Sequence, residues 1–571
     1  PIEPARMFGR TVLQWDKEDC AWMGLVKFDL LGLGMLSALS ISFDLISQHC
    51  GRFWTLASIP RNEPGVYDML CRGDSIGVFQ VESRAQIGAL PRLKPRCFYD
   101  LAVEIGLIRP GPVQGGAVHP YIRRRTGVEP VTYPHPLLEP VLERTLGIPL
   151  FQEQLMQMAT TVGNCTAADA DLLRRAMGSK RGVERIDSLR TKLFEGMAAN
   201  GIDDDTAQGI YARIESFANF GFAESHALSF AGLVYTSAWI KLHYPAVFLA
   251  ALLRSQPMGF YSSATLVADA RRHGVVTRRP DVARSSVGAD LELLDACCEE
   301  LGSEELETGI DECLHDHDES EIGAFDPNRD DGDHRRDTHF AVRLGLSDVS
   351  GINIETATRI VEERERESFA SLDDLARRVD LSGEEVEALA LAGAFDDLVG
   401  SRRGALWQIG QINGVGPGQL DVQVVTQPPL LPEPTQMELL GDDLRATGIS
   451  TADHPVRQVR DALNRRGVVQ VDRLDGVETR RRIEVAGVVT HRQRPGTAGG
   501  VTFLNLEDET GLLNVIVTPG AWRHYRRVAR TSRALVVRGI LERGDEGVMS
   551  LQADRLEALD LSVPTKSRDF R

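Results

Sequence analysis

The sequence predicts a multidomain α+β chain in which a large, mostly helical region is followed by a small β-barrel. The length of 571 residues allows several domains with separate cores. Residues 51–275 consist mainly of helical patterns joined by Pro/Gly turns. Residues 482–560 contain five short runs in which apolar and polar residues alternate, as they do in half-buried strands.

Near the N-terminus, one base and one acid interrupt an apolar run. Residues 26–31 predict a buried strand that ends at Gly32, and a helix is expected from 36 to about 49. Lys27 and Asp29 lie two positions apart, so their side chains would leave one face of the strand. An acid that holds Mg²⁺ beside a cation facing phosphate fits this layout. An ordinary ion pair at a strand end is the alternative.

The helical region carries a cluster of cations at the end of one predicted helix. Thr166 and Asp169 form a capping box that opens this helix, and Arg174 and Arg175 near its end are followed by Lys180. Such cation density suits a triphosphate or a DNA backbone phosphate. Neighbouring like charges are also common on solvated faces, and this alternative stays open.

Five further residues in the helical region are candidates for contacts with DNA or nucleotide. Arg109 precedes a rigid Pro-Gly-Pro turn that fixes the direction of its guanidinium. Arg123, Arg124 and Arg125 form a basic cluster that we expect to contact the DNA backbone rather than to read bases. His226 either lines an active site or is a structural histidine.

Most of the net charge of −18 lies in one segment. Residues 291–335 contain 17 Asp/Glu against Arg329 and Arg335, a net charge of −15. Like charges repel and few apolar residues are present, so we expect a disordered or loosely ordered acidic insertion. The alternative is a metal site formed by Cys297, Cys298, Cys313, His315 and His317. Their spacing matches no common zinc module, which favours a solvated loop.

Residues 344–364 resemble a helix-hairpin-helix module. In such a module a glycine-containing hairpin offers backbone N–H groups to a DNA phosphate. Gly351 and Asn353 would lie in the hairpin; Asn353 replaces the usual glycine, and it tolerates a left-handed conformation. An ordinary αα-hairpin is the alternative.

The five alternating runs, with a helical segment at 521–529 after the third, follow the strand order of an OB-fold. This fold binds single-stranded nucleic acid, and a purely structural OB domain is the alternative. The candidate contacts are His491, Arg492, Arg494 and Phe503. Upstream of the barrel, residues 428–434 form a proline-rich linker. Residues 436–440 faintly resemble the pentapeptide that docks on the bacterial sliding clamp.

Composition excludes several other classes. Hydrophobic residues make up 42% and charged residues 26%, both ordinary values for a globular protein. No run of 18 apolar residues is present, so no membrane span is expected. Eight cysteines without regular spacing indicate reduced thiols and a cytoplasmic location rather than a disulfide framework.

Six blocks between residues 27 and 227 resemble, in the same order, the bacterial C-family DNA polymerases, the α subunits of DNA polymerase III. Lys27-Phe28-Asp29 followed by Leu-Gly-Leu is similar to the motif that carries the family's third catalytic aspartate. The blocks are Lys27–Met35, Gly77–Ser83, Ile108–Pro112, Phe151–Gln154, Leu173–Gly178 and Gly221–Ala227. The Ala-Glu before Ser225-His226 and the opening Gly9–Asp16 resemble the error-prone, translesion branch.

The resemblance implies a DNA-directed DNA polymerase that uses Mg²⁺, deoxynucleoside triphosphates and primed template DNA, and that meets other translesion proteins. Asp29 would be one of three metal-binding acids, with Lys27 beside it. The residues implied to face the nucleotide are Arg174, Arg175, Lys180 and His226. Those expected to contact DNA are Arg109, Arg123, Arg124, Arg125, Gly351, Asn353, Arg492, Arg494 and Phe503.

The family's other two acids lie in an Asp-x-Asp motif that this sequence does not contain, so we expect a C-terminal piece of a longer polymerase, inactive alone. The expected units are the end of the palm (1–50), fingers (51–285), acidic insertion (286–338), helix-hairpin-helix (339–400), linker region (401–480) and OB-fold (481–561). NAD-dependent DNA ligases carry a Lys-x-Asp-Gly motif. That reading is rejected because Lys27-Phe28-Asp29 is followed here by Leu30 instead of glycine. A non-enzymatic DNA-binding accessory protein is the remaining alternative.

Overall fold

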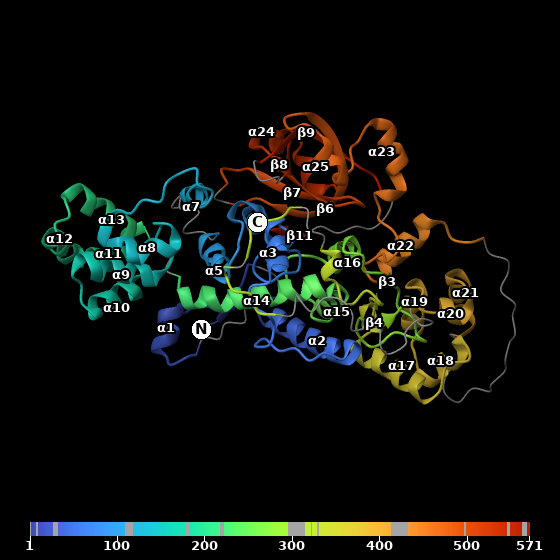
Figure 1. Cartoon of the computed structure of the whole chain (residues 1–571). Coiled ribbons are helices and arrows are strands. Elements are labelled where there is room, and N and C mark those ends of the chain that lie inside the picture. The colour runs from blue at the N-terminus through green and yellow to red at the C-terminus, as the bar shows by residue number, and fades with distance from the viewer. Residues whose placement is uncertain are drawn as a thin grey trace.

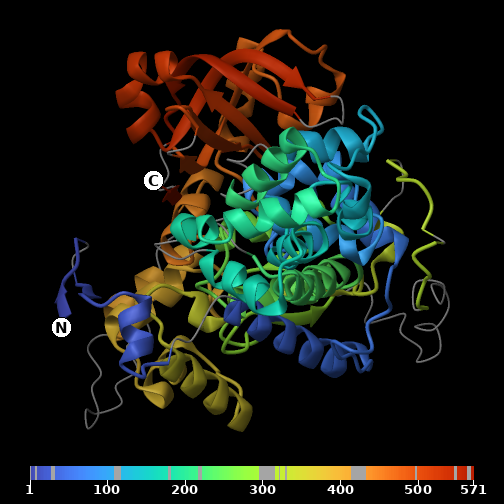
Figure 2. The ribbon, with the colours of Figure 1, turned by 90° about the vertical axis from the view of Figure 1, so that its left-hand side faces the viewer.

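A helical body occupies the centre of the computed structural model, with a helical lobe on one side and a second helical unit on the other (Figure 1). A β-barrel lies above the body in this view, and in both views it lies at a different edge of the body from the second helical unit (Figure 2). The structure describes residues 2–6, 9–26, 32–108, 118–177, 182–216, 222–294, 315–320, 322–327, 331–412, 432–495, 498–544, 549–561 and 568–570. The multidomain α+β prediction is confirmed.

The first described elements are short. β1 (Ile2–Pro4) pairs antiparallel with β2 (Thr11–Leu13), and α1 (Lys17–Trp22) follows. The predicted strand at 26–31 lies almost entirely outside the described residues. The helix expected at 36–49 is confirmed as α2 (Leu33–Cys50).

The body is built around α14 (Glu224–His243), which packs against α2, α3 and α5. Small and apolar side chains, including Ala231, Val234 and Ala238, are fully buried, which lets neighbouring helices approach closely. Around it lie α3 (Pro64–Cys71), α4 (Arg84–Leu93), α5 (Phe98–Leu107), α7 (Val118–Arg125), α15 (Pro245–Arg254) and α16 (Ser263–Arg272). A small sheet of order β3-β5-β4 (Thr277–Arg278, Phe340–Arg343, Asp290–Leu293) borders the body.

The lobe has an apolar core of its own, which includes Leu155, Leu173 and Ile210. Its helices are α8 (Glu139–Leu142), α9 (Gln152–Gly163), α10 (Ala167–Ala176), α11 (Gly182–Asp187), α12 (Arg190–Ala199) and α13 (Asp204–Ser216). The predicted capping box is confirmed, because Asp169 Oδ2 accepts from Thr166 N at 2.7 Å and Thr166 Oγ1 accepts from Asp169 N.

The second helical unit, which we call the hairpin unit, differs from the prediction at its start. The first expected helix is a single 3-10 turn, Leu346–Asp348, and the second is α17 (Ile354–Arg366). Asn353 is extended (φ −88°) rather than left-handed, because its side chain caps α17. The unit continues with α18 (Leu372–Val379), α19 (Gly383–Leu391), α20 (Asp396–Val399), α21 (Arg402–Ile412) and α22 (Gln436–Ala446).

The barrel confirms the OB-fold order. The sheet order is β11-β6-β7-β8-β10-β9, and an additional β6–β9 pairing closes a barrel of five strands. Its strands are β6 (Arg482–Gln493), β7 (Thr502–Glu507), β8 (Leu512–Val517), β9 (Ala534–Arg543) and β10 (Met549–Ala558), with β11 (Arg568–Phe570) beside β6. Two short helices follow the third strand, α24 (Pro519–His524) and α25 (Arg526–Thr531). Before the barrel lies α23 (Arg460–Arg466).

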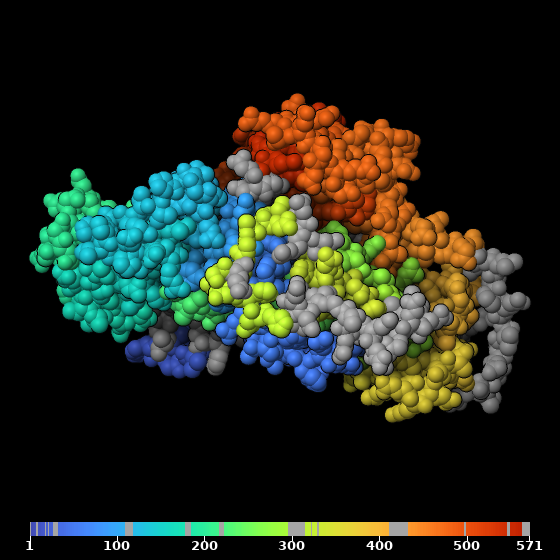
Figure 3. Space-filling model, in the orientation of Figure 1, coloured from blue at the N-terminus to red at the C-terminus, as the bar shows by residue number. Residues whose placement is uncertain are grey.

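The acidic segment is ordered at both ends of its expected range of 286–338. β4 pairs with β5 at one end, and at the other end the buried carboxylate of Asp337 accepts from Ala246 N at 2.7 Å. Figure 3 shows residues 315–320 and 322–327, in yellow-green, lying across the helical body. There Arg61 N donates to Asp316 Oδ1 and His317 N donates to Arg61 O. The expectation of a loose insertion is therefore wrong for these stretches, which bond to the body.

Candidate nucleotide and DNA interface

Two of the family-like blocks, Phe151–Gln154 and Gly221–Ala227, meet at the first turn of α14. Glu224 N donates to Glu153 Oε2 at 2.8 Å, and Gln152 N donates to Phe222 O at 2.9 Å. Tyr99 Oη donates to the Glu224 carboxylate at 2.6 Å. Burial is the main cause that raises the pKa of Tyr99, and this hydrogen bond raises it further. These bonds fix the start of α9 in the lobe against the start of α14 in the body.

A ladder of rings extends from this meeting point to Gly32, which follows the Asp29 segment in the sequence. The His226 ring lies 5.4 Å from the Phe222 ring and 4.1 Å from the Phe230 ring. Phe230 contacts Phe79 at 5.1 Å. Gly32 has a left-handed backbone (φ +87°), and a side chain there would come within 3.3 Å of Phe79. His226, between Phe222 and Phe230, is itself exposed.

Arg174 and Arg175 lie in the last turn of α10. Both pair with Asp171, at 2.8 and 2.6 Å, and their side chains remain 45% and 68% exposed. The hydrogen bond from Arg174 lowers the pKa of Asp171. One carboxylate thus orients two guanidinium groups that remain open to solvent.

Four predicted site residues lie outside the described residues. They are Lys27, Asp29, Arg109 and Lys180. The nearest described residues are Val26 and Gly32 around the first pair, and Met177 and Gly182 around Lys180.

The three arginines of α7 have different environments. Arg124 donates to Leu146 O at 2.6 Å and to Thr132 O, and Arg125 donates to Asp100 Oδ2 at 2.6 Å. These bonds tie α7 to its neighbours. Arg123 pairs with Glu129 on the surface and is 52% exposed, so it is the member best placed for a DNA backbone.

The hairpin unit presents the start of α17. Gly351 has a left-handed backbone (φ +97°), and only Ala388 would lie near a side chain added there, at 3.7 Å. Asn353 Oδ1 accepts from Thr356 N at 2.8 Å. The remaining N–H groups of a first helical turn suit a phosphate, although Glu355 adds a carboxylate to this turn.

In the barrel, two predicted contacts are engaged within the protein. Arg492 is buried, and its guanidinium donates to the carbonyl oxygens of Ala529 and Ser532. His491 Nε2 lies 2.7 Å from Phe260 O of the body. Arg492 therefore holds the barrel domain together, and His491 docks the barrel on the body.

The other two barrel candidates differ in accessibility. Phe503 lies under the Arg84 guanidinium of α4 at 5.1 Å, again at the contact with the body. Arg494 is exposed and stacks on Trp522 at 5.7 Å. Sequence reasoning missed Trp522, although an aromatic residue after the third strand was visible.

The clamp-like pentapeptide forms the start of α22. Its last residue, Leu440, is buried, and α22 packs against α19. This stretch is thus part of the hairpin unit's packing.

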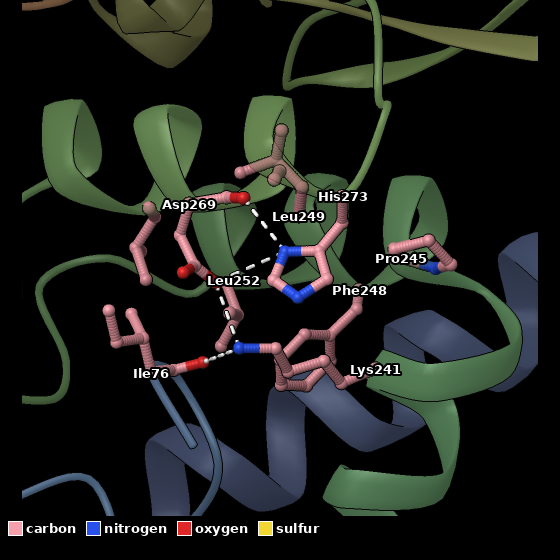
Figure 4. A pocket seen from close by; sticks show the side chains of 10 residues that line it. Ile76, Lys241, Pro245, Phe248, Leu249, Leu252, Asp269 and His273 are labelled. Carbon is pink, nitrogen blue, oxygen red and sulfur yellow. Dashed lines mark hydrogen bonds and ion pairs between the residues drawn. The ribbon is translucent and has the colours of Figure 1, made fainter. Parts of the chain in front are cut away.

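Sequence reasoning also missed a buried charge cluster in the body, of which Figure 4 shows Lys241, Asp269 and His273. Lys241 Nζ donates to Asp74 at 2.7 Å, Asp269 at 2.9 Å and Ile76 O at 3.0 Å beside a cavity of about 20 Å³. Burial alone would lower the Lys241 pKa, but Asp269 and Asp74 raise it above its ordinary value. His273 Nε2 lies 2.5 Å from Asp74 and completes the cluster. Its cations all have carboxylate partners, so we read it as structural.

Comparison with known families agrees with these domains. The model of the bacterial DNA polymerase III alpha subunit finger domain matches residues 35–201. A helix-hairpin-helix model matches residues 274–405, and a model of an OB-fold nucleic acid binding domain matches residues 483–559. DNA polymerases as a class use divalent metal ions. Among the described residues, no helix is both long and apolar enough to cross a bilayer.

Curated relatives match the whole chain. It is 52% identical to the error-prone DNA polymerase of Mycolicibacterium paratuberculosis and 51% identical to that of Mycobacterium tuberculosis H37Rv, in each case over 100% of this chain and 48% of the relative. The error-prone DNA polymerase of Corynebacterium glutamicum is 48% identical, over 50% of its length. The chain spans about half the length of the curated relatives it matches. It is therefore related over its whole length to the error-prone DNA polymerases, and it carries the finger domain of a bacterial DNA polymerase III α subunit together with helix-hairpin-helix and OB-fold domains.

Proposed function

We propose that this chain forms the nucleotide-facing and DNA-holding part of an error-prone, DNA-directed DNA polymerase that copies damaged template in DNA repair. The observation that carries the proposal is the meeting of blocks at the start of α14. Glu153 and Glu224 join two of these blocks directly, and the ring ladder links His226 to Gly32 at the edge of the Asp29 segment. Residues far apart in sequence are thus brought into contact, which supports a shared site.

The chemistry that we assign to this surface is templated nucleotidyl transfer. Asp29 is the proposed ligand of Mg²⁺, because carboxylate oxygens are the ligands that this ion prefers. When bound, the metal neutralises charge on the transferring phosphoryl group. Lys27, Lys180 and the exposed pair Arg174 and Arg175 would orient the triphosphate by charge-assisted hydrogen bonds.

DNA would be held by exposed cations and by open backbone groups. We assign backbone contacts to Arg109, Arg123 and the start of α17 at Gly351 and Asn353. Arg494 with Trp522 would stack on a single-stranded base. We place the protein in the cytoplasm with its DNA substrate.

The proposal is tested by primer extension with the whole polymerase. Asp29→Asn should abolish extension, a loss on the order of several kcal/mol of transition-state stabilisation, while the circular dichroism of the fold is unchanged. Near-normal extension by this variant would remove Asp29 from the site.

The arginine pair gives a second test. Arg174→Ala and Arg175→Ala should raise the nucleotide KM or lower kcat, by roughly tenfold or more, with little change in primer-template Kd. Asp171→Asn is the matched control, because it keeps both cations and removes only the carboxylate that orients them. A collapse of template affinity with unchanged nucleotide kinetics would make the pair a DNA contact instead.

A further inference from the structure

Three potential metal ligands converge at the end of α14, away from the proposed polymerase site. His243 is the last residue of α14, Glu63 precedes the first turn of α3, and His334 ends the 3-10 turn Gly332–His334. Glu63 Oε2 lies 2.7 Å from His243 Nε2, and Glu63 Oε1 lies 3.4 Å from His334 Nδ1. One potential ligand atom from each residue lies within 4.8 Å of the others.

The carboxylate in this triad is buried and incompletely bonded. Glu63 is 1% exposed and His243 is fully buried. Glu63 Oε1 has no hydrogen-bond partner within the part of the chain that the structure describes. A buried carboxylate oxygen that points into a set of imidazole nitrogens is the arrangement that a divalent cation satisfies.

The second nitrogen of His243 is placed as in known metal sites. Its Nδ1 lies 2.9 Å from the backbone oxygen of His334. Donation to that carbonyl leaves the Nε2 lone pair free for a metal, the usual support for a ligating histidine. Arg336 Nε, however, donates to the same Nδ1 at 3.2 Å. While that bond is made, Nε2 carries the proton and donates to Glu63, so metal binding requires Nδ1 to exchange Arg336 for the His334 carbonyl as its partner.

The close approach of His334 depends on a missing side chain. A Cβ added at Gly65 would lie 2.8 Å from both Cε1 and Nε2 of the His334 ring. Glycine at this position lets the ring close over the carboxylate of Glu63.

We propose that Glu63, His243 and His334 bind one divalent ion of the zinc type, with a fourth position open to water. Two imidazoles and a carboxylate suit zinc, whereas Mg²⁺ prefers oxygen ligands only. Two ligand atoms about 2.1 Å from a tetrahedral zinc ion lie about 3.4 Å apart, so the 2.7 Å contact must open by roughly 0.7 Å. The ion joins α3, α14 and the end of the acidic segment, so it acts as a structural clip.

The test uses the chain in a background without competing donors. Cys297, Cys298 and Cys313 are replaced by Ser, and His315 and His317 by Ala, in every sample. After chelator treatment, Zn²⁺ is titrated against a chromophoric chelator, and Co²⁺ is followed by its visible absorption. The fluorescence of Trp239 gives an internal probe. Its ring lies 4.5 Å from that of His243, so bound Co²⁺ should quench this fluorescence.

We expect one equivalent of Zn²⁺ to bind and to raise Tm, with no such effect from Mg²⁺. His334→Ala should weaken zinc binding by at least about 100-fold and remove the Tm shift, because one of three protein ligands is lost. His119→Ala, an exposed histidine of α7, is the matched control and should bind as the parent does. His334 lies on a surface turn, so its variant should fold even if Glu63→Gln does not. No binding by the parent, or unchanged binding by His334→Ala, would overturn the proposal.

Discussion

The helical body and the barrel are stabilised by different kinds of contact. The body buries charged groups that pair across long sequence separations, such as Lys241 with Asp74 and Asp269. The core of the barrel is apolar, with Leu504 and Val515 fully buried among its members. Several of the barrel's buried polar groups lie where it meets other elements. The contrast suggests that the barrel is specified by the apolar–polar alternation within each strand. The body is instead specified by ion pairs between residues far apart in the sequence.

The largest expected effect comes from removing the body's buried cation. Lys241→Met keeps most of the volume but leaves Asp74 and Asp269, within the described part of the chain, with His273 and Arg272 as their ion-pair partners. The free energy of unfolding of the body should fall by about 3 to 5 kcal/mol, because buried charge is left uncompensated. Calorimetry that resolves the body and barrel transitions measures it.

The matched change in the barrel is a truncation, Val515→Ala. It should cost about 2 kcal/mol, from lost burial and a small cavity. If Lys241→Met costs less than Val515→Ala, the ion pairs do not specify the body and the comparison fails.

The same contrast decides what could be predicted from sequence. The run expected to begin at Leu513 is β8, Leu512–Val517, because alternation is visible within a few residues. Glu63 and His243 are 180 residues apart, and nothing local to either marks the pair. The three adjacent arginines of α7 were visible, but the acceptors that engage Arg124 and Arg125 were not.

The candidate site was predicted from whole blocks rather than from single patterns. Resemblance placed His226 in a site, and the structure adds the rings that connect it to Gly32. Asn353 shows the limit of residue preferences. A left-handed backbone was plausible for an asparagine, but its side chain instead accepts from Thr356 N, and only the fold reveals that choice.

A pH dependence tests the contact between the two regions. Glu507 of β7 is buried against the body, where Thr265 Oγ1 donates to it at 3.3 Å. Burial raises its pKa to about 7, with Asp269 and Asp508 adding to the shift and Arg272 opposing it. Below its ordinary pKa of 4.5, the residue is neutral in both folded and unfolded states and costs nothing. Between pH 4.5 and 7, the loss of folding stability caused by the buried, ionised Glu507 grows with pH, and above pH 7 the full loss remains.

Glu507→Gln should therefore stabilise the protein at pH 8 by on the order of 2 kcal/mol, and by clearly less at pH 5.5. Denaturation of both proteins at the two pH values checks this. Glu557→Gln is the control, since its carboxylate pairs with Arg466 on the barrel surface and its pKa is lowered. A gain for Glu507→Gln that does not change with pH would mean that its ionisation is not what costs stability.

The smallest expected effect compares the two faces of the barrel. Arg494, which stacks on Trp522, is exposed, whereas Phe503 lies under Arg84 of the body. If single-stranded DNA stacks on the accessible face, Trp522→Ala should weaken oligonucleotide binding by about 1 kcal/mol, near fivefold, at fixed low salt. Phe503→Leu should leave that affinity unchanged and instead lower the temperature at which the barrel separates from the body. The reverse outcome would mean that DNA displaces Arg84 and uses the docked face, so that the barrel must leave the body before it binds.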